Sequence, residues 1–425
     1  MLKIVIIGGG SAIWTKNIVG DLSLTPTLHG SEVVLVDIDP QRLESAGALS
    51  RRISNDLGAG LEIKTSLDRR EALVGADYVI ISISVGGNDA WLQDIEIPWK
   101  QFNIMQTVGD TIGPGGIFRT FRHMPVMLEI ALDIKSICPD AWTIQLTNPM
   151  TPLCRAIEKR VGIKMIGYCH GVQDTEGYLA HEFGIRPDQI ELYGYGVNHF
   201  LFIQSVLIDG KDGMKRFEEH AESFRVNHPS LYELWRAYGL FPVNWDRHPV
   251  EFVPFFLNAR REYGKSNGLN QEATYSHIEA SQGIVNTILG ELNSPNPMKI
   301  NHSYERIIEI IEALHTNKNY IVHVNVRNNG AILNLPFECN VEVPAVINRH
   351  GCHPLVMGEL PRGLDSLVRR IAEEQELIVE ASLAGSRQIA VQAIAMDPLV
   401  GDVKLAGELF DAMFQAQKSY LLQFS

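Results

Sequence analysis

Short apolar runs separated by helical stretches make up the first half of the chain. The runs are rich in Val and Ile, and they cover Lys3–Ile7, Val33–Val36, Asp77–Ser84, Trp142–Leu146 and Lys164–Gly167. A helical stretch reaches about Leu24, and an amphipathic helix covers Pro125–Ile137. Nearly continuous apolar strands that alternate with helices are typical of a parallel sheet covered on both faces. The pattern predicts an α/β fold whose N-terminal part is a Rossmann-like, doubly wound parallel sheet.

The rhythm of the pattern changes near residue 195, without a linker-like or low-complexity segment at that point. Beyond it we expect helices together with an antiparallel sheet around Ile321–Val346, which makes the second part an α+β domain. A chain of 425 residues is long enough for two or three domains of about 100–200 residues each. We therefore predict a first domain over residues 1–195 and a second domain over residues 196–425.

Composition and charge narrow the class of protein. The chain is 45% hydrophobic and 20% charged, and its formal net charge of −13 argues against binding to a phosphate backbone, which requires a basic face. No apolar run approaches the roughly 18–20 residues that span a bilayer, and the N-terminus lacks the features of a secretory signal. We expect a cytoplasmic protein that binds neither nucleic acid nor membrane, and whose five cysteines form no disulfide framework.

A glycine-rich turn joins the first apolar run to the helix that follows it. Gly8 and Gly10 form a Gly-x-Gly motif, and Asp37 follows the second run, 27 residues after Gly10. Glycines let the backbone approach a pyrophosphate at a helix N-terminus, and the acid accepts hydrogen bonds from the adenosine ribose. Ile13 replaces the third glycine, so the strand–turn–helix–strand context carries the prediction of a dinucleotide site. Asp37 favours NAD over NADP, while Arg42 leaves binding of a 2′-phosphate open.

Polar groups follow the later strands, at the positions where doubly wound sheets bind ligands. Asn148 follows one strand, Cys169 and His170 follow the next, and His199 ends the segment Tyr-Gly-Val-Asn-His. Cys and His are borderline-soft ligands that suit Mn, Fe, Co, Ni or Zn. The 30 residues between Cys169 and His199 match no zinc-finger spacing. A buried structural cysteine and a hydrogen-bonded core histidine are therefore the alternative.

Two further segments combine charge with glycine or aromatic residues. Residues 109–116 read GDTIGPGG and precede Arg119 and Arg122, which predicts a flexible loop that folds over a pocket and arginines that meet carboxylates. Residues 246–248 read DRH and, with Glu251, lie between aromatic residues as in a cleft wall. A plain connecting loop and a structural ion pair are the respective alternatives.

Taken in order, these segments resemble glycoside hydrolase family 4, the NAD- and metal-dependent glycosidases. The likeness includes the start IVIIGGGS, the stretch TVGDTIGPGGIFR, and the strand ends LTNP, GYCHG and YGVNHF. In the second half it continues through NNGAILNLPFECNVEVPAVINRHGCHPL to AMDPLV. The nucleotide-binding half alone also resembles lactate and malate dehydrogenases.

The resemblance implies roles for the polar residues. Cys169 and His199 match the ligands of a divalent metal, usually Mn²⁺, and Asn148 matches a residue that touches the substrate near the metal. With Asn148, the expected substrate contacts are Asn198, Arg119 and Arg247. NAD is the expected cofactor, and the residues expected to hold it are Gly8, Gly10, Ser11, Asp37 and Ser84.

The family mechanism differs from that of glycosidases with two carboxylates. NAD⁺ takes hydride from C3 of the sugar, the metal polarises the ketone, a base removes the C2 proton, and the C1 leaving group is eliminated. Water then adds, and NADH returns the hydride to C3.

The acid and the base of this mechanism come from different segments. Phospho-sugar members use a tyrosine as the base in the segment that here reads NWDRHPVEFVPFF, which contains no tyrosine. We expect Asp246 or His248 in its place, with Asp246 favoured. His170 is the expected general acid, and Asp110 is expected to orient the substrate or to act on the leaving group.

The charge of the loop after the third predicted strand indicates which class of substrate the protein binds. The loop from Ser84 to Asp94 contains no Arg or Lys, and its two aspartates repel a phosphate, which disfavours 6-phospho-glycosides. The segments resemble members that act on unphosphorylated α-glycosides, and Arg119, Arg122 or Arg247 can pair with a uronate carboxylate. We therefore expect an α-hexuronide, foremost an α-galacturonide, as the substrate.

Several alternatives stay open. Within the family they are an α-galactosidase, an α-glucosidase, an α-glucuronidase and a 6-phospho-glycosidase. Outside it, an NAD-dependent sugar or hydroxy-acid dehydrogenase would release NADH, and a nucleotide sensor would not catalyse at all. The resemblance also implies a homodimer or homotetramer, with the second half covering the nicotinamide end and closing the pocket.

Overall fold

A parallel sheet forms the first half of the protein in the computed structural model, which describes residues 1–292, 294–303 and 305–424. The strands pair in the order β3-β2-β1-β4-β5-β6, which is the order of a Rossmann fold. Their bounds are β1 (Lys3–Ile7), β2 (Glu32–Val36), β3 (Glu62–Ser66), β4 (Tyr78–Ile81), β5 (Trp142–Gln145) and β6 (Met165–Gly167). The predicted Rossmann-like sheet is therefore confirmed.

Helices cover both faces of this sheet, as its apolar strands require. One face packs against α1 and α2, and the other packs against α5 and α6. The helices of this half are α1 (Ala12–Leu24), α2 (Pro40–Leu57), α3 (Arg69–Leu73), α4 (Gly87–Phe102), α5 (Gly113–Ile137), α6 (Met150–Arg160) and α7 (Gly171–Phe183). The carboxyl ends of the parallel strands thus share one edge, where ligands of doubly wound sheets bind.

The sheet continues without a break into an antiparallel half. Beyond β6 the order runs β11-β12-β7-β8-β10, with β13 on β12 and β9 on β8. The strands are β7 (Ile190–Val197), β8 (Phe200–Ile208), β9 (Lys211–Asp212), β10 (Phe241–Pro242), β11 (Tyr320–Arg327), β12 (Asn340–Asn348) and β13 (Gly351–Pro354). The antiparallel sheet predicted around Ile321–Val346 is confirmed as β11 and β12.

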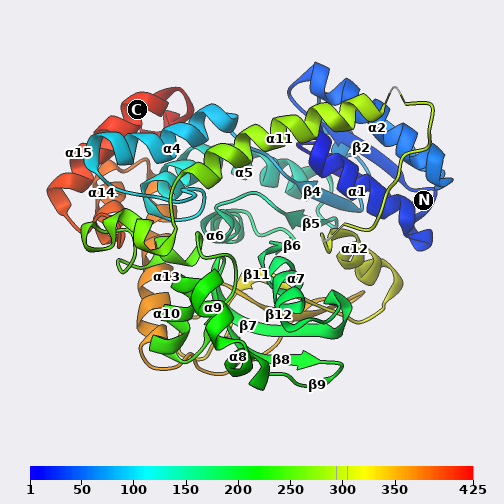
Figure 1. The fold of residues 1–425 in the computed structure, drawn as a ribbon. Coiled ribbons are helices and arrows are strands. Elements are labelled where there is room, and N and C mark those ends of the chain that lie inside the picture. Colours follow the sequence, from blue (N-terminus) through cyan, green and yellow to red (C-terminus); the bar gives the residue numbers. More distant parts are fainter. Residues whose placement is uncertain (293, 304, 425) are drawn as a thin grey trace.

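The remaining helices are α8 (Lys215–Glu219), α9 (Ala221–Asn227), α10 (Pro229–Tyr238), α11 (Glu272–Glu291), α12 (Ile307–Thr316), α13 (Leu364–Ala384), α14 (Arg387–Met396) and α15 (Val403–Gln417). Some of them lie beside the antiparallel strands, α11 crosses the top of the molecule, and α14 and α15 lie beside α4 (Figure 1). Figure 1 shows α11 running from the side of α4 to α1, and Lys16 of α1 pairs with Glu291 of α11 at 2.7 Å. Helix α11, which belongs to the second half of the chain, therefore packs against helices of the first half.

The remaining predictions about the fold missed one strand or are left untested by the structure. The strand β3 was not predicted, because its residues are mostly exposed and show no apolar alternation. All five cysteines are free thiols. Among the described residues, no helix is long and apolar enough to cross a membrane. Residue 195 lies within β7, and both the division into domains at that point and the cytoplasmic location stay predictions.

The loop predicted at residues 109–116 is correct only in part, because residues 109–112 lie outside helices and strands whereas residues 113–116 are helical. Gly113 to Gly116 form the buried first turn of α5, with Pro114 at its start. A Cβ on Gly115 would stand 2.7 Å from the Gly109 carbonyl oxygen, and one on Gly116 would stand 2.4 Å from the main chain of Thr111. These glycines serve close backbone packing, which fixes the segment in place.

Arg122 lies in the core and is not available to a substrate. Its guanidinium donates to both carboxylate oxygens of Asp94, at 2.8 and 2.6 Å, and both side chains are fully buried. Gln417 of α15 joins the pair by donating to Asp94 at 2.8 Å. The pair connects α4, α5 and α15, and it neutralises one of the two aspartates that were expected to repel a phosphate.

Replacing Asp94 with Ala should strongly destabilise the protein. The substitution leaves a buried guanidinium without its counter-charge, and removing one partner of a buried ion pair typically lowers the free energy of unfolding by about 3–5 kcal/mol. Chemical denaturation measures this change. The control is Asp188→Ala, which breaks the exposed pair with Arg186 and should leave the unfolding midpoint unchanged. Equal stability of both variants would contradict the role of Asp94.

Candidate active site

The glycine turn after β1 is shaped by its contact with the neighbouring strands. Gly8 adopts φ 93°, and a Cβ there would stand 1.8 Å from the carbonyl oxygen of Ser82. The amides of Gly8 and Gly9 both donate to Val36 at 2.9 Å, and the Ser11 hydroxyl caps α1 by accepting from Trp14. The turn therefore brings bare backbone to the start of α1, where a pyrophosphate can bind.

Asp37 lies at the end of β2, beside this turn. Its carboxylate accepts from the amide of Gly10 at 2.8 Å and from the amide of Asp39 at 3.0 Å. Ser84 is exposed just after β4. The five residues expected to hold NAD thus lie at the carboxyl ends of β1, β2 and β4, and their contact with a nucleotide stays a prediction.

The tip of a hairpin brings His199 to Cys169. Cys169 follows β6, whereas His199 is in the two-residue turn between β7 and β8, with the left-handed φ of 64° that His tolerates better than most residues. Cys169 Sγ and His199 Nε2 are 3.3 Å apart, and both residues are buried. The two residues predicted as metal ligands, 30 positions apart in sequence, are therefore neighbours in space.

Four further residues complete the cluster around His199. The ligand atoms of Asp110, His199 and His248 lie within 4.8 Å of one another, and the two imidazole rings are 4.4 Å apart between centroids. Thr111 Oγ1 lies 2.8 Å from His199 Nδ1 and 2.7 Å from a carboxylate oxygen of Asp110. Asn148 donates to the other carboxylate oxygen of Asp110 at 3.3 Å. The cluster therefore combines sulfur, imidazole and carboxylate donors.

The cysteine has its own polar support. Asn198 hydrogen-bonds Cys169 and also donates to Glu342 of β12 at 2.9 Å. Burial raises the pKa of the Cys169 thiol above its usual range, and raises the pKa of Glu342 to about 7. A cation bound at the sulfur would reverse the first effect, since a coordinating thiol is deprotonated.

Electrostatics keep Asp110 charged and His199 neutral. Burial opposes ionisation of Asp110, but the neighbouring His199, His248 and Arg119 and the bond from Thr111 lower its pKa to about 2. Burial lowers the pKa of His199 to about 4 despite the charge of Asp110. A neutral imidazole beside a carboxylate is the state in which histidine binds a metal.

Two arginines face the cluster with unused donors. Arg119 donates through Nε to the Asn148 carbonyl oxygen at 3.2 Å, while its buried Nη1 has no partner among the described residues. Arg247 makes no side-chain hydrogen bond in the described part of the chain, and its charge acts on His199 and on His248. Both guanidiniums can therefore meet an anionic group.

His170 lies between two carboxylates at the strand end beside Cys169. Its ring nitrogens lie 3.3 Å from Glu305 and 3.6 Å from Asp174. Burial alone would lower the pKa of His170, but the hydrogen bond and charge of Glu305, with the charge of Asp174, raise it to about 9. The imidazolium can donate a proton, as expected of a general acid.

Asp246 does not lie in this cluster. Its carboxylate accepts from His228 at 2.9 Å and from the amides of Ser230 and Leu231 at the start of α10, at 2.8 and 3.3 Å. Helix N-termini stabilise carboxylates, so Asp246 has a structural partner set that the linear sequence does not reveal. Of residues 246–248, the structure brings His248 and Arg247 to the site instead.

Several residues that support the site were not predicted from the sequence. Thr111, Glu305 and Glu342 contact the predicted site residues but lie in segments without a recognisable ligand spacing. Glu251, noted only as a charge, accepts from the amides of Val108 and Gly109 at 2.8 and 3.0 Å and so holds the segment that carries Asp110. The position of Thr111 next to Asp110 in the sequence was the only signal that could have identified one of these supporting residues.

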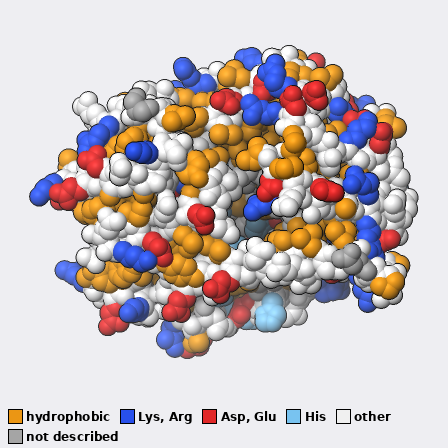
Figure 2. All heavy atoms as spheres, turned by 90° about the horizontal axis from the view of Figure 1, so that it is seen from above, with side chains coloured by type: hydrophobic (Ala, Val, Ile, Leu, Met, Phe, Trp, Pro, Cys, Tyr) orange, Lys and Arg blue, Asp and Glu red, His pale blue; other side chains and the backbone are white. Residues whose placement is uncertain are grey.

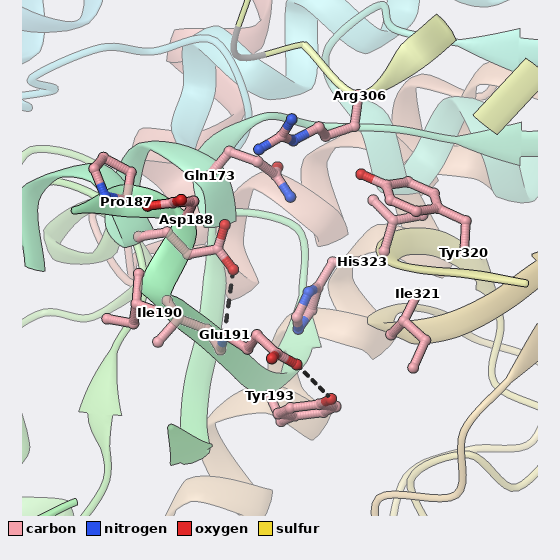
Figure 3. Close-up of a pocket in the computed structure, with 13 residues that line it drawn as sticks. Gln173, Pro187, Asp188, Ile190, Glu191, Tyr193, Arg306, Tyr320, Ile321 and His323 are labelled. Atoms are coloured by element: carbon pink, nitrogen blue, oxygen red, sulfur yellow. Dashed lines mark hydrogen bonds between the residues drawn. The ribbon is translucent and has the colours of Figure 1, made fainter. Parts of the chain in front are cut away.

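The surface is hollowed near the centre of the face seen in Figure 2, with charged side chains around the hollow. A different cavity, of 210 Å³, lies between α7, β7 and β11 (Figure 3). Gln173, Tyr320 and His323 point into it, and the residues that line it include none of the cluster around His199. This cavity is separate from the candidate active site.

Known proteins resemble the chain along its whole length. The chain is 34% identical to an alpha-galactosidase of Bacillus subtilis over the full length of both, and 32% identical to an alpha-galacturonidase of the same bacterium over 97% of each. A 6-phospho-beta glucosidase from Thermotoga maritima, solved with manganese, NAD+ and glucose-6-phosphate, shares its fold with a TM-score of 0.82 at 24% identity over 99% of each chain.

The dehydrogenase-like fold and the family are both supported. Malate dehydrogenase from Plasmodium falciparum matches 90% of this chain and 99% of its own, with a TM-score of 0.54 at 17% identity, a likeness of fold. The model described as "Family 4 glycosyl hydrolase" matches residues 3–185, and that described as "Family 4 glycosyl hydrolase C-terminal domain" matches residues 194–400. With both models matched in order across most of its length, the chain belongs to family 4 of the glycosyl hydrolases.

Proposed function

We propose that this chain is an NAD- and Mn²⁺-dependent glycosidase that hydrolyses an unphosphorylated α-hexuronide, foremost an α-galacturonide. The observation that carries the proposal is the 3.3 Å approach of Cys169 Sγ to His199 Nε2, at the sheet edge that also holds the glycine turn. The 32% identity to an alpha-galacturonidase supports the substrate class, and the manganese and NAD+ of the Thermotoga maritima structure support the cofactors.

The donor geometry fits a divalent metal. Cys169 Sγ and His199 Nε2 are 3.3 Å apart, which is close enough for one divalent cation to bind both atoms. The amide oxygens of Asn148 and Asn198 are buried without partners among the described residues. Cys169 and His199 would hold the metal.

The nucleotide site fits NAD for similar reasons. The bare turn from Gly8 to Gly10 leads into α1, and Asp37 at the end of β2 suits an adenosine ribose. NAD held at this turn would supply a reversible hydride acceptor, and a metal held by Cys169 and His199 would supply Lewis-acid polarisation of a sugar oxygen. The residues of the chain have to orient the sugar, exclude water and move protons.

The proposed proton-transfer residues flank the cluster. His248 lies beside His199, and we assign it the removal of the C2 proton, because Asp246 is engaged by α10. We assign protonation of the leaving group to His170, because its contact with Glu305 raises its pKa to about 9. Asp110 accepts from Asn148, so this pair orients the sugar hydroxyls near the metal ligands.

Charge favours a uronate over a phosphate-bearing sugar. Among the described residues, the Arg247 guanidinium has no hydrogen-bond partner and Nη1 of Arg119 is buried without one, so each can bind a carboxylate. The loop after β4 supplies no cation for a phosphate, and Asp89 remains exposed there, although Asp94 is neutralised by Arg122. An α-galactosidase is the second candidate, favoured by the 34% identity to such an enzyme. We further propose a homodimer or homotetramer, which native mass spectrometry tests.

Hydrolysis should require both cofactors. Metal-stripped, reduced protein is assayed on chromogenic α-galacturonide, α-glucuronide, α-galactoside, α-glucoside and a 6-phospho-glucoside, with NAD⁺ and Mn²⁺ added singly and together. We expect cleavage of the α-galacturonide only when both are present, without accumulation of NADH, because the hydride returns to the sugar. Cleavage of the phosphorylated substrate alone, or steady NADH formation from a free sugar, would contradict the proposal.

Replacing Cys169 with Ala should abolish hydrolysis and weaken Mn²⁺ binding. Losing one of two strong donors removes much of the binding energy, so we expect at least about a 100-fold weaker Mn²⁺ affinity in calorimetry, beyond the 10–100-fold typical of outer-shell changes. Binding of NAD⁺ should be retained, since the glycine turn is untouched. Cys138→Ala removes another buried thiol and serves as the control. Mn²⁺ affinity equal to that of the parent would refute the metal assignment.

Replacing Arg247 with Met should change selectivity rather than fold. A hydrogen bond to a charged group contributes about 1.5–3 kcal/mol, so kcat/KM for an α-galacturonide should fall about 10- to 100-fold. The same ratio for the neutral α-galactoside should change much less. Arg236→Met, at an exposed pair with Glu218, is the control. Equal losses on both substrates would show that Arg247 does not recognise the carboxylate.

A further inference from the structure

Thr111 connects the carboxylate of Asp110 to the imidazole of His199. We propose that Thr111 is a positioning residue that fixes the tautomer of His199, so that Nε2 presents its lone pair toward Cys169. The inference rests on the proposed metal site, and it assigns a role to a residue outside the ligand set.

The direction of the hydrogen bonds follows from proton counting. A hydroxyl has one proton, and an ionised carboxylate can only accept, so Thr111 Oγ1 donates to Asp110 at 2.7 Å. The contact of 2.8 Å between Thr111 Oγ1 and His199 Nδ1 must then be donated by the ring. A neutral imidazole has one N–H, so Nε2 is left unprotonated. This nitrogen is the one that lies 3.3 Å from Cys169 Sγ.

The hydroxyl is held too firmly to reorient. Thr111 is 4% exposed, and the main chain before it is held where the amides of Val108 and Gly109 donate to buried Glu251. On the other side, the amide of Gly113 donates to buried Asp397 at 2.9 Å. Two buried carboxylates therefore clamp the segment on both sides of Thr111.

Losing the hydroxyl would release the imidazole. Without an acceptor at Nδ1, the ring can carry its proton on Nε2, and the N–H then faces the position of the metal. Groups that orient a metal-binding histidine through its second nitrogen typically change metal affinity by about 10- to 100-fold when they are removed. Among the described residues, Thr111 is the only one that hydrogen-bonds Nδ1 of His199.

The test is calorimetric titration of metal-stripped protein with Mn²⁺ alone, without NAD⁺ or sugar. Thr111→Val keeps the shape but removes the hydroxyl, and it should weaken Mn²⁺ binding about 10- to 100-fold. Thr111→Ser keeps the hydroxyl and should bind within about threefold of the parent. The matched control is Thr120→Val in α5, which removes another buried hydroxyl whose bond, at 2.9 Å, goes to the Gly116 carbonyl oxygen. The control should bind Mn²⁺ as the parent does.

Each other outcome overturns the inference. Parent-like affinity in Thr111→Val, a serine variant as weak as the valine variant, or an equally weak Thr120→Val would show that the hydroxyl does not act through His199. If circular dichroism shows that Thr111→Val is unfolded, Thr111→Ala is compared with Thr111→Ser by the same titration and the same criteria. A parent that binds no Mn²⁺ refutes the proposed metal site itself, which distinguishes that failure from failure of the role of Thr111.

Discussion

The close approach of backbones where the parallel strands meet the antiparallel strands is the constraint on which the site depends. β6 and β11 pair at Gly167 and Asn325, and a Cβ on Gly167 would stand 2.9 Å from that of Asn325 and 2.7 Å from the sulfur of Cys154. Only glycine fits there. The joint allows one sheet to present Cys169 at the end of a parallel strand and His199 at the tip of an antiparallel hairpin.

Buried charge at this joint is matched by local partners. Asp110 accepts from Thr111 and Asn148, Glu342 accepts from Asn198, and each network ends at a proposed metal ligand. Unpaired buried charges are costly, so such networks require well-defined geometry from the segments that carry them. The glycines at the start of α5 fulfil this requirement, since their close packing gives rigidity where the composition alone indicates flexibility.

Arginine has two different uses within one turn of α5. Arg122 is enclosed with Asp94 and Gln417 and stabilises the packing of three helices, whereas Arg119, beside Asn148, has a nitrogen without a partner in the described part of the chain. The two positions differ by less than one helical turn, so they face different surroundings. Specificity for a charged sugar therefore depends on which arginines pair with carboxylates in the core and which can still donate hydrogen bonds at the site.

The sequence by itself determined the Rossmann-like half, the glycine turn, the antiparallel pair β11–β12 and the family, because these depend on local periodicity and on motifs in a fixed order. It also identified Cys169 and His199 as partners, through resemblance rather than spacing. Only the tertiary structure decided that His248 and not Asp246 lies beside His199, and that Thr111 lies between Asp110 and the ring. Asp246 and His248 are two residues apart, and which of them reaches the cluster depends on α10, whose amide groups bind one carboxylate through contacts that no local pattern encodes.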